Sequence, residues 1–313
     1  MTTASTEIVK QIRQSKELDK PREGEQLLCD VHTHTLFSRH AYSTIEENVR
    51  AAAEAGLELL GSTDHFSAML EPKTPFDGTD DLENYQFYIN QRVWPRLWHG
   101  VILLRGVEAD IVDLDGHLFG YGHAIPSSIT GKRFAETTDL DERVLSKLDY
   151  TIASIHGSNF TQDATSLQLT NMYIKALENP HVLILGHIVR SKLDVEFDPI
   201  LEAARDMNKL IEINEYTLGG YSEHVEKVKR LAERAAELNC QIAVSSDAHI
   251  APYIGKYPMV ENLFEEIGFP RELIATRDAQ SFLLALDRAN IARPQLDSPF
   301  KKLPDAQKDL LPE

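Results

Sequence analysis

The sequence predicts an α/β fold, a closed barrel of parallel strands in a single domain. Short apolar runs of strand length alternate with amphipathic helical patterns, which is typical of a parallel sheet. Histidines and carboxylates follow directly after successive apolar runs, and the active sites of closed parallel barrels gather at the carboxyl ends of the strands. No internal repeat and no linker interrupts residues 26–293, which are expected to form the barrel domain.

The apolar runs define seven expected strands, near residues 27–32, 57–62, 101–107, 149–155, 182–185, 210–213 and 242–245. A helix should follow the first strand, because Thr44 and Glu47 have the spacing of a capping box and Gly56 is a natural stop. Later helices are expected at about 168–177, from Asp198-Pro199 onward, at about 222–238 and at about 280–290.

Three segments depart from this simple alternation. Residues 68–81 form a long insertion with prolines and an acidic cluster, and long loops inside compact domains are usually functional or disordered. Residues 85–98 are aromatic and mostly helical in pattern despite Pro95. The strand that begins at residue 101 continues to an Asp115-Gly116 turn with the character of a hairpin tip.

Both ends of the chain are expected to lie outside the barrel. Residues 1–25 are polar with few apolar side chains and predict a flexible arm, whereas residues 294–313 predict an extended or disordered tail punctuated by prolines. The first 25 residues lack the apolar core of a signal peptide, and no stretch approaches the roughly 20 apolar residues of a membrane span. We therefore expect a cytoplasmic protein that has no membrane partner.

The charge balance argues against one class of partner. Lysine and arginine number 32 against 49 aspartates and glutamates, so the formal charge is −17. No basic run or interleaved patch of arginine and aromatic residues suits a phosphate backbone. Long nucleic acids are therefore disfavoured as partners, and the 42% hydrophobic content is ordinary for a protein with a sizeable core.

The candidate site begins in the stretch Cys29-Asp30-Val31-His32-Thr33-His34. Side chains of a strand alternate between two faces, so His32 and His34 should project together, as metal ligands do. An isolated pair of this kind is equally consistent with surface or core histidines. Repetition favours the metal site, because random surface histidines would not fall at the ends of successive strands.

Nine side chains are candidate ligands for divalent transition metals: His32, His34, His40, His65, Glu108, His156, His187, Asp247 and His249. A set dominated by imidazoles suits zinc, manganese or iron better than magnesium or calcium. It is too large for one tetrahedral ion and suits two or three ions that share a carboxylate. A polynuclear hydrolytic centre is the natural inference.

These motifs resemble the PHP (polymerase and histidinol phosphatase) superfamily of metal-dependent phosphoesterases. The resemblance rests on Asp30-x-His32-x-His34, Thr63-Asp64-His65, Glu108, His156, His187 and Asp247-x-His249, which occur in the family's order. It extends to the bacterial stand-alone phosphatases of the YcdX type through His40-Ala41-Tyr42-Ser43-Thr44 and Leu104-Arg105-Gly106-Val107-Glu108. The resemblance implies a distorted (β/α)7 barrel that holds a trinuclear centre, commonly of zinc or manganese.

The resemblance also implies roles for individual residues. It assigns one ion to His32, His34, Glu108 and Asp247, a second to Glu108, His156 and His187, and a third to His40, His65 and His249. Asp30 and Asp64 are expected to orient histidines through their far nitrogens. Glu108 and Asp247 are the carboxylates expected to act in catalysis.

Arg190 is the third residue expected to act in catalysis. It follows His187 by three residues and could bind phosphate through parallel hydrogen bonds. The alternative is an ordinary pair with Asp194, four residues further on.

The expected activity is hydrolysis of small phosphomonoesters by a metal-activated hydroxide. Histidinol phosphate is the named alternative substrate, and a phosphodiesterase or nuclease of the same superfamily is an alternative activity. The acidic composition and the absence of an appended polymerase domain argue against the nuclease. A metal-binding scaffold without activity is disfavoured because every ligand position is filled. Relatives of this kind suggest a homo-oligomer.

Overall fold

The computed structural model describes residues 26–70, 82–127, 131–157, 159–220 and 222–291. The expected N-terminal arm, residues 71–81 of the insertion and the expected C-terminal tail lie outside the described residues. Within the described part of the chain, no helix is both long enough and apolar enough to cross a bilayer.

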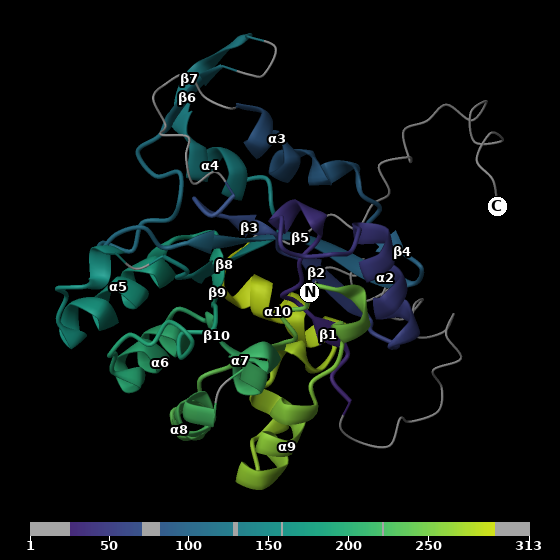
Figure 1. The fold of residues 1–313 in the computed structure, drawn as a ribbon, viewed down its shortest axis with the longest axis vertical. Coiled ribbons are helices and arrows are strands. Elements are labelled where there is room, and N and C mark those ends of the chain that lie inside the picture. The colour runs from purple at the N-terminus through teal and green to yellow at the C-terminus, as the bar shows by residue number, and fades with distance from the viewer. Residues whose placement is uncertain (1–25, 71–81, 128–130, 158, 221, 292–313) are drawn as a thin grey trace.

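Seven parallel strands form a nearly closed barrel at the centre of the molecule (Figure 1). Their order around the barrel is β1 (Cys29–Asp30), β2 (Leu59–Ser62), β5 (Val101–Asp110), β8 (Tyr150–Ser154), β9 (Val182–Leu185), β10 (Leu210–Asn214) and β11 (Ile242–Ser245). A parallel bridge between Thr33 and Ala248 joins the segments that follow β1 and β11. The seven expected strands and the α/β barrel are therefore confirmed.

The helices of the barrel connections lie around the sheet (Figure 1). They are α2 (Ile45–Glu54), α5 (Ser166–Glu178), α6 (Phe197–Asp206), α8 (Ser222–Glu237) and α9 (Pro258–Ile267). The capping box that begins α2 is confirmed: Thr44 Oγ1 accepts from the Glu47 N–H at 3.2 Å, and Glu47 Oε2 accepts from the Thr44 N–H at 2.7 Å. Gly56 ends this unit with a φ of 77°, which glycine adopts without strain.

The last helix, α10 (Ala279–Arg288), lies against the amino-terminal ends of the strands, because its first N–H donates to Glu58 at the entrance to β2. Phe282 of α10 packs in one cluster with Ile102 and Leu104 of β5, whereas Leu103 packs with α2 on the outside. This alternation fills the barrel with side chains. The opposite mouth is left for the polar residues that follow the strands.

Several connections differ from the sequence expectation. Only the first part of residues 85–98 is helical: α3 (Leu82–Asn90) leads into a 3-10 turn, and β4 (Leu97–Trp98) pairs antiparallel with β5. Pro95 has no N–H for a helix, and Gly100, with a φ of 75°, turns the chain back. The Asp115-Gly116 turn is confirmed, since Ile111 and Leu118 form an antiparallel bridge around it.

Further short elements lie in the connections. The β6–β7 hairpin (Ala124–Ser127 and Arg133–Asp139) projects away from the barrel next to α4 (Leu140–Leu145) (Figure 1). The other elements are β3 (His65–Phe66), which pairs with β5, α7 (Glu215–Gly220), and 3-10 turns at Leu36–Ser38, Gln91–Val93, Asn159–Thr161, Ala251–Tyr253, Arg271–Leu273 and Ala275–Arg277.

One close contact inside the barrel requires glycine. A Cβ at Gly61 of β2 would lie 1.9 Å from the hydroxyl oxygen of Tyr150 and 3.1 Å from Cα of Val31. The same Tyr150 hydroxyl donates to the carbonyl of Val31 at 2.5 Å. The Tyr150 side chain therefore ties β8 to the segment that follows β1, across a strand that carries no side chain at this point.

We expect Gly61→Ala to destabilise the fold by about 1–3 kcal/mol, because an overpacked core must move rigid neighbours. Tyr150→Phe should cost about 1 kcal/mol for its lost hydrogen bond. The double variant should lose less than the sum, since the phenylalanine removes the nearest clashing atom. Urea denaturation midpoints measure this coupling, with Gly219→Ala as a control at an exposed site whose nearest atom would be 3.7 Å away. Strict additivity would contradict the proposed contact.

Candidate metal centre

The candidate ligands meet at the carboxyl ends of the barrel strands. Two of them, His32 and His34, follow β1, and Glu108 lies near the end of β5. His156 follows β8, and His187 follows β9. The others are His40 in the loop after β1, His65 at the start of β3, and Asp247 and His249 in the segment after β11. Loops and strand ends that are far apart in the sequence thus supply one shared site.

Glu108 occupies the centre of this site and is 0% exposed. Its Oε1 lies 2.6 Å from Nε2 of His187 and 3.4 Å from Nε2 of His156. Its Oε2 lies 2.8 Å from Nδ1 of His65 and 3.3 Å from Nε2 of His32. Nε2 of His34 lies 3.5 Å from the same Oε2. Each carboxylate oxygen therefore faces at least two imidazoles, an arrangement in which one carboxylate could be shared by two cations.

Asp247 supplies a second carboxylate on the other side of His32 and His34. Its Oδ1 lies 3.1 Å from Nε2 of His34 and 3.6 Å from Nε2 of His32. Its Oδ2 accepts a hydrogen bond from Nη1 of Arg190 at 2.6 Å. Arg190 therefore lies at the site and pairs with Asp247, not with Asp194 as the alternative interpretation held.

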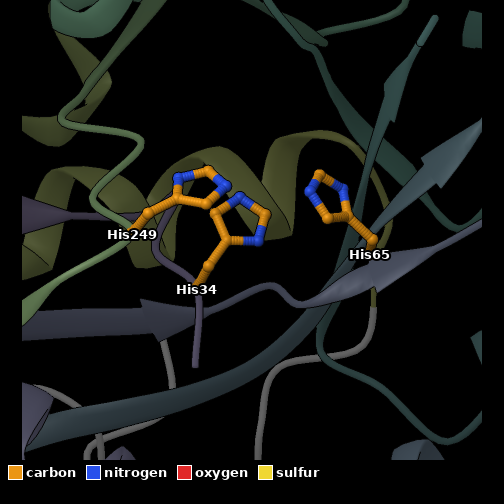
Figure 2. Close-up of side chains that lie close together, drawn as sticks. All are labelled: His34, His65 and His249. Carbon is orange, nitrogen blue, oxygen red and sulfur yellow. The ribbon is translucent and has the colours of Figure 1, made fainter. Parts of the chain in front are cut away.

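The histidines stack closely at one side of the centre. Figure 2 shows His34 and His249, whose ring centroids are 4.2 Å apart, with His65 facing them at 4.4 Å from His34. His40 stacks on His249 at 4.7 Å, and its Nε2 lies 3.2 Å from Nε2 of His65. The structure thus brings His40 to the same cluster.

Four triads of side chains have ligand atoms within 4.8 Å of one another: His32-Glu108-His187, His32-His34-Asp247, His65-Glu108-His156 and His34-His65-His249. Among the described residues, these triads include every sequence-predicted ligand except His40. The last triad contains His34 where the resemblance implies His40. The geometry is therefore that of several overlapping sites.

Hydrogen bonds at Nδ1 fix several of these imidazoles in orientation. His32 donates from Nδ1 to Oε1 of Glu212 at 2.7 Å, and His156 donates to Oδ1 of Asp110 at 2.7 Å. His249 donates from Nδ1 to the carbonyl of Asp247 at 3.0 Å. With Nδ1 protonated, the lone pair of each ring is left on Nε2, which is the nitrogen directed at the centre.

Asp64 acts on His34 through an intermediate hydroxyl. Ser38 Oγ donates to Oδ1 of Asp64 at 2.7 Å and lies 2.9 Å from Nδ1 of His34, from which it accepts.

The expectation that Asp30 orients a histidine is wrong. Its carboxylate accepts from the N–H and hydroxyl of Ser246 and from the N–H of Gly255, so it holds the backbone around β11 instead of a histidine.

Two further functional residues were not predicted from the sequence: Glu212 and Asp110, the carboxylates that orient His32 and His156. Glu212 also accepts from the N–H of His187 at 2.6 Å and from the hydroxyl of Ser245. A signal was present, because a glutamate between Ile211 and Ile213 in an otherwise apolar strand is a charge that must face polar partners.

Unsatisfied buried polar atoms indicate that the arrangement could hold metal ions. Buried nitrogens and oxygens at its centre lie close to one another but not at the angles that a hydrogen bond requires: His32 Nε2, His34 Nε2, His65 Nδ1, Glu108 Oε2 and Asp247 Oδ1. Buried polar atoms are almost always satisfied, and those that are not need an explanation such as an ion. Imidazole nitrogens and carboxylate oxygens that converge in this way are a donor set for transition metals.

The protonation states of the acids suit metal binding. Burial alone would raise the pKa of Glu108, but His156, His32 and His65 hold it well below its usual range. Burial would likewise raise the pKa of Asp247, yet His32 and Arg190 hold it well below normal. Both carboxylates are therefore charged at neutral pH, as ligands must be.

The pKa values of two buried histidines are shifted in opposite directions. Burial, together with the neighbouring His65, lowers the pKa of His34 well below its usual value, so its ring is neutral. Burial would also lower the pKa of His32, but Glu212 and Asp247 raise it well above normal. A proton and a metal ion therefore compete for His32, and acid should weaken binding there.

Two residues of the site hold a backbone conformation that costs energy. His187 has a φ of 25° and Asp247 a φ of 55°, both in the left-handed region that non-glycine residues seldom adopt. Such conformations cost of order 1–3 kcal/mol and cluster at functional sites. Here they bring side chains from the ends of β9 and β11 toward Glu108.

The structure is thus that of a parallel α/β barrel with a candidate polynuclear metal centre at the carboxyl ends of its strands. Comparison with known proteins identifies the family. A family model described as the PHP domain matches residues 30–219. A probable phosphatase from Photobacterium profundum is 35% identical over 259 residues, which are 82% of this chain and 93% of that protein. A probable phosphatase from Clostridium botulinum is 34% identical over 256 residues, with the same coverage of 82% and 93%. The chain belongs to the PHP domain family.

A solved structure supports the fold. The histidinol phosphate phosphatase from Lactococcus lactis, complexed with zinc, L-histidinol and phosphate, matches with a TM-score of 0.50 and 19% identity. The match covers 81% of this chain and 98% of that one. The overall arrangement of strands and helices is therefore shared.

We expect Glu212→Gln to weaken zinc binding by about 10–100-fold. The two carboxylate oxygens of Glu212 accept hydrogen bonds from His32, His187 and Ser245, whereas a glutamine side chain offers only one acceptor oxygen. Competition with a chromogenic chelator measures the affinity. Glu142→Gln is the matched control, since Glu142 pairs with His181 at 3.1 Å on the surface. Equal affinities in the wild type and the Glu212 variant would show that Glu212 does not support the centre.

Proposed function

We propose that this protein hydrolyses small phosphomonoesters at a centre of three divalent transition-metal ions. The observation that carries the proposal is the buried Glu108, whose two oxygens face imidazoles from four different strand ends and loops. The expected class of enzyme, a hydrolase of phosphoric esters, is confirmed by relatives named probable phosphatases. The number of ions and the substrate are our proposal.

The proposed ligand sets follow the resemblance and the contacts together. His32, His34, Glu108 and Asp247 would hold one ion, Glu108, His156 and His187 a second, and His40, His65 and His249 a third. His34 stacks on His249 and is close enough to serve as a ligand of the third ion as well. Zinc, manganese and iron all suit these donors, and the zinc in the Lactococcus structure supports the first of them.

When bound, such ions would lower the pKa of a water molecule toward neutrality and stabilise negative charge on phosphoryl oxygens. The chain's own residues prepare the site for this chemistry. Glu108 and Asp247 contribute only two negative charges among the ligands, so three divalent ions would leave the site strongly cationic. Glu212, Asp110 and Ser38 hold the imidazoles so that their lone pairs point inward.

Arg190 extends this cationic character to the mouth of the barrel. One guanidinium nitrogen is engaged by Asp247, and the side chain is 24% exposed, so other N–H groups can reach a ligand. A guanidinium that donates parallel hydrogen bonds favours the terminal phosphoryl group of a monoester over the single charge of a diester. We therefore propose monoesters as substrates, with histidinol phosphate as one candidate among them. The cytoplasmic location and the homo-oligomer stay predictions.

Removal of the metal tests the proposal directly. We expect the purified protein to contain two to three transition-metal ions per chain, as measured by elemental analysis, and to hydrolyse an aryl phosphate. Dialysis against a strong chelator should abolish turnover, and added zinc or manganese should restore it. Full activity in metal-free protein would refute the mechanism, and preference for a bis-aryl diester would favour the phosphodiesterase alternative.

Arg190→Ala should raise KM for monoesters about tenfold or more, because a charged hydrogen bond to the phosphoryl group is lost. Diester kinetics should change little. Arg205→Ala is the control, since Arg205 lies exposed on α6 and pairs with Asp206. Metal content must be measured in parallel because Arg190 contacts Asp247. Unchanged monoester kinetics at full metal content would remove Arg190 from the substrate site.

A further inference from the structure

An exposed aromatic ring lies beside the candidate metal centre. Tyr216 belongs to α7, which follows directly from the carboxyl end of β10. The centroid of the Tyr216 ring is 6.4 Å from the centroid of the His249 ring. The Cζ atom of Arg190 lies 5.5 Å from the same Tyr216 centroid. The side chain is nevertheless 62% exposed. Tyr216 thus adjoins a candidate ligand and the guanidinium at the mouth, yet most of its surface faces solvent.

The backbone that carries this ring is held on both sides. Asn214 Oδ1 accepts from the N–H of Thr217 at 2.9 Å, and the carboxylate of Glu215 accepts from the N–H groups of Met259 and Val260, both at 3.0 Å. The Asn214 amide also donates to Asp247 at 3.4 Å. These bonds fix α7 relative to β11 and α9. A ligand that contacted Tyr216 would therefore meet a surface that is already in place.

Apolar exposure continues on the neighbouring segment. Ile250 directly follows His249, and Tyr253 lies three residues further on; they are 36% and 64% exposed. Isolated surface apolar residues need no explanation, but exposed aromatic and aliphatic side chains that adjoin a candidate metal centre suit the binding of an apolar group. The phosphoryl group of a monoester would lie at the cationic centre, so the neighbouring apolar surface is available to the rest of the substrate.

We propose that Tyr216 determines substrate specificity by stacking on a planar, apolar leaving group, so that the preferred substrates are phosphomonoesters with an aromatic or heteroaromatic ring. This inference rests on the proposed phosphatase function. Two features carry it: the ring is exposed on a backbone segment that hydrogen bonds hold in place, and it lies next to a guanidinium suited to phosphate. Stacking on one aromatic ring tolerates many planar partners and distinguishes them from aliphatic groups.

The test compares three esters of primary alcohols, whose leaving groups have similar basicity: ethyl, 2-cyclohexylethyl and 2-phenylethyl phosphate. With zinc-loaded wild type, KM should be about tenfold lower for the phenylethyl ester than for the ethyl ester, and the cyclohexyl ester should lie between them. Tyr216→Ala should abolish this preference and leave KM for the ethyl ester within about twofold. Tyr216→Phe should retain it. Tyr121→Ala serves as the control, because Tyr121 is 54% exposed and stacks on His117.

Calorimetric binding of the matching phosphonates, which cannot be hydrolysed, separates the two proposals. If wild type prefers phenylethylphosphonate but hydrolyses none of the esters, the phosphatase function fails while the role of Tyr216 in binding stands. If all three esters are hydrolysed with equal KM, or the preference survives in Tyr216→Ala, the role of Tyr216 is overturned while the function stands. Equal loss for every ester in Tyr216→Ala, with reduced metal content, would make Tyr216 a structural support of the centre and overturn the inference.

Discussion

The structure depends on one buried carboxylate. Removing Glu108 from water carries a desolvation penalty of several kcal/mol, and only close hydrogen-bond donors or cations can offset it. The chain supplies imidazoles from the ends of β1, β8 and β9 and from β3, and these lie within 2.6 to 3.4 Å of the Glu108 oxygens. Such an arrangement forms only when the strands have closed into a barrel. Closure of the barrel and assembly of the candidate metal ligands at its mouth therefore depend on each other.

Much of the fold could be predicted because its signals are local. Each barrel strand is an apolar run with a polar residue at its end or within the next two positions, and the Thr44 capping box lies within a few residues of the helix it begins. The connections carry weaker signals. The β6–β7 hairpin is half polar, α7 is a single short helix, and β4 forms because Trp98 meets Val101 across a turn, not because of any strand pattern. Tertiary pairing, which the sequence does not display, determines those elements.

The candidate ligands could be found for a similar reason, since histidines at the ends of buried strands are unusual. Their supporting residues could not be assigned with the same reasoning. Glu212 reaches His32 across 180 positions of sequence, and Asp110 reaches His156 across 46, so each role exists only in the closed barrel. Asp30 shows the converse error: its place two residues before His32 suggested a histidine partner, but Ser246 and Gly255, more than 200 positions further along the chain, donate to its carboxylate in the folded barrel.

The seam of the barrel has a consequence for how the protein is made. The segment after β1 meets the segment after β11, where the N–H of His34 donates to the carbonyl of Ala248. Protein synthesis proceeds from the N-terminus, so a ribosome must complete most of the chain before Asp247 and His249 can join the earlier ligands. A nascent chain therefore holds an incomplete ligand set until Asp247 and His249 have been added. Metal binding by the complete ligand set would therefore have to follow synthesis of the segment after β11, and it would fasten the first strand to the last.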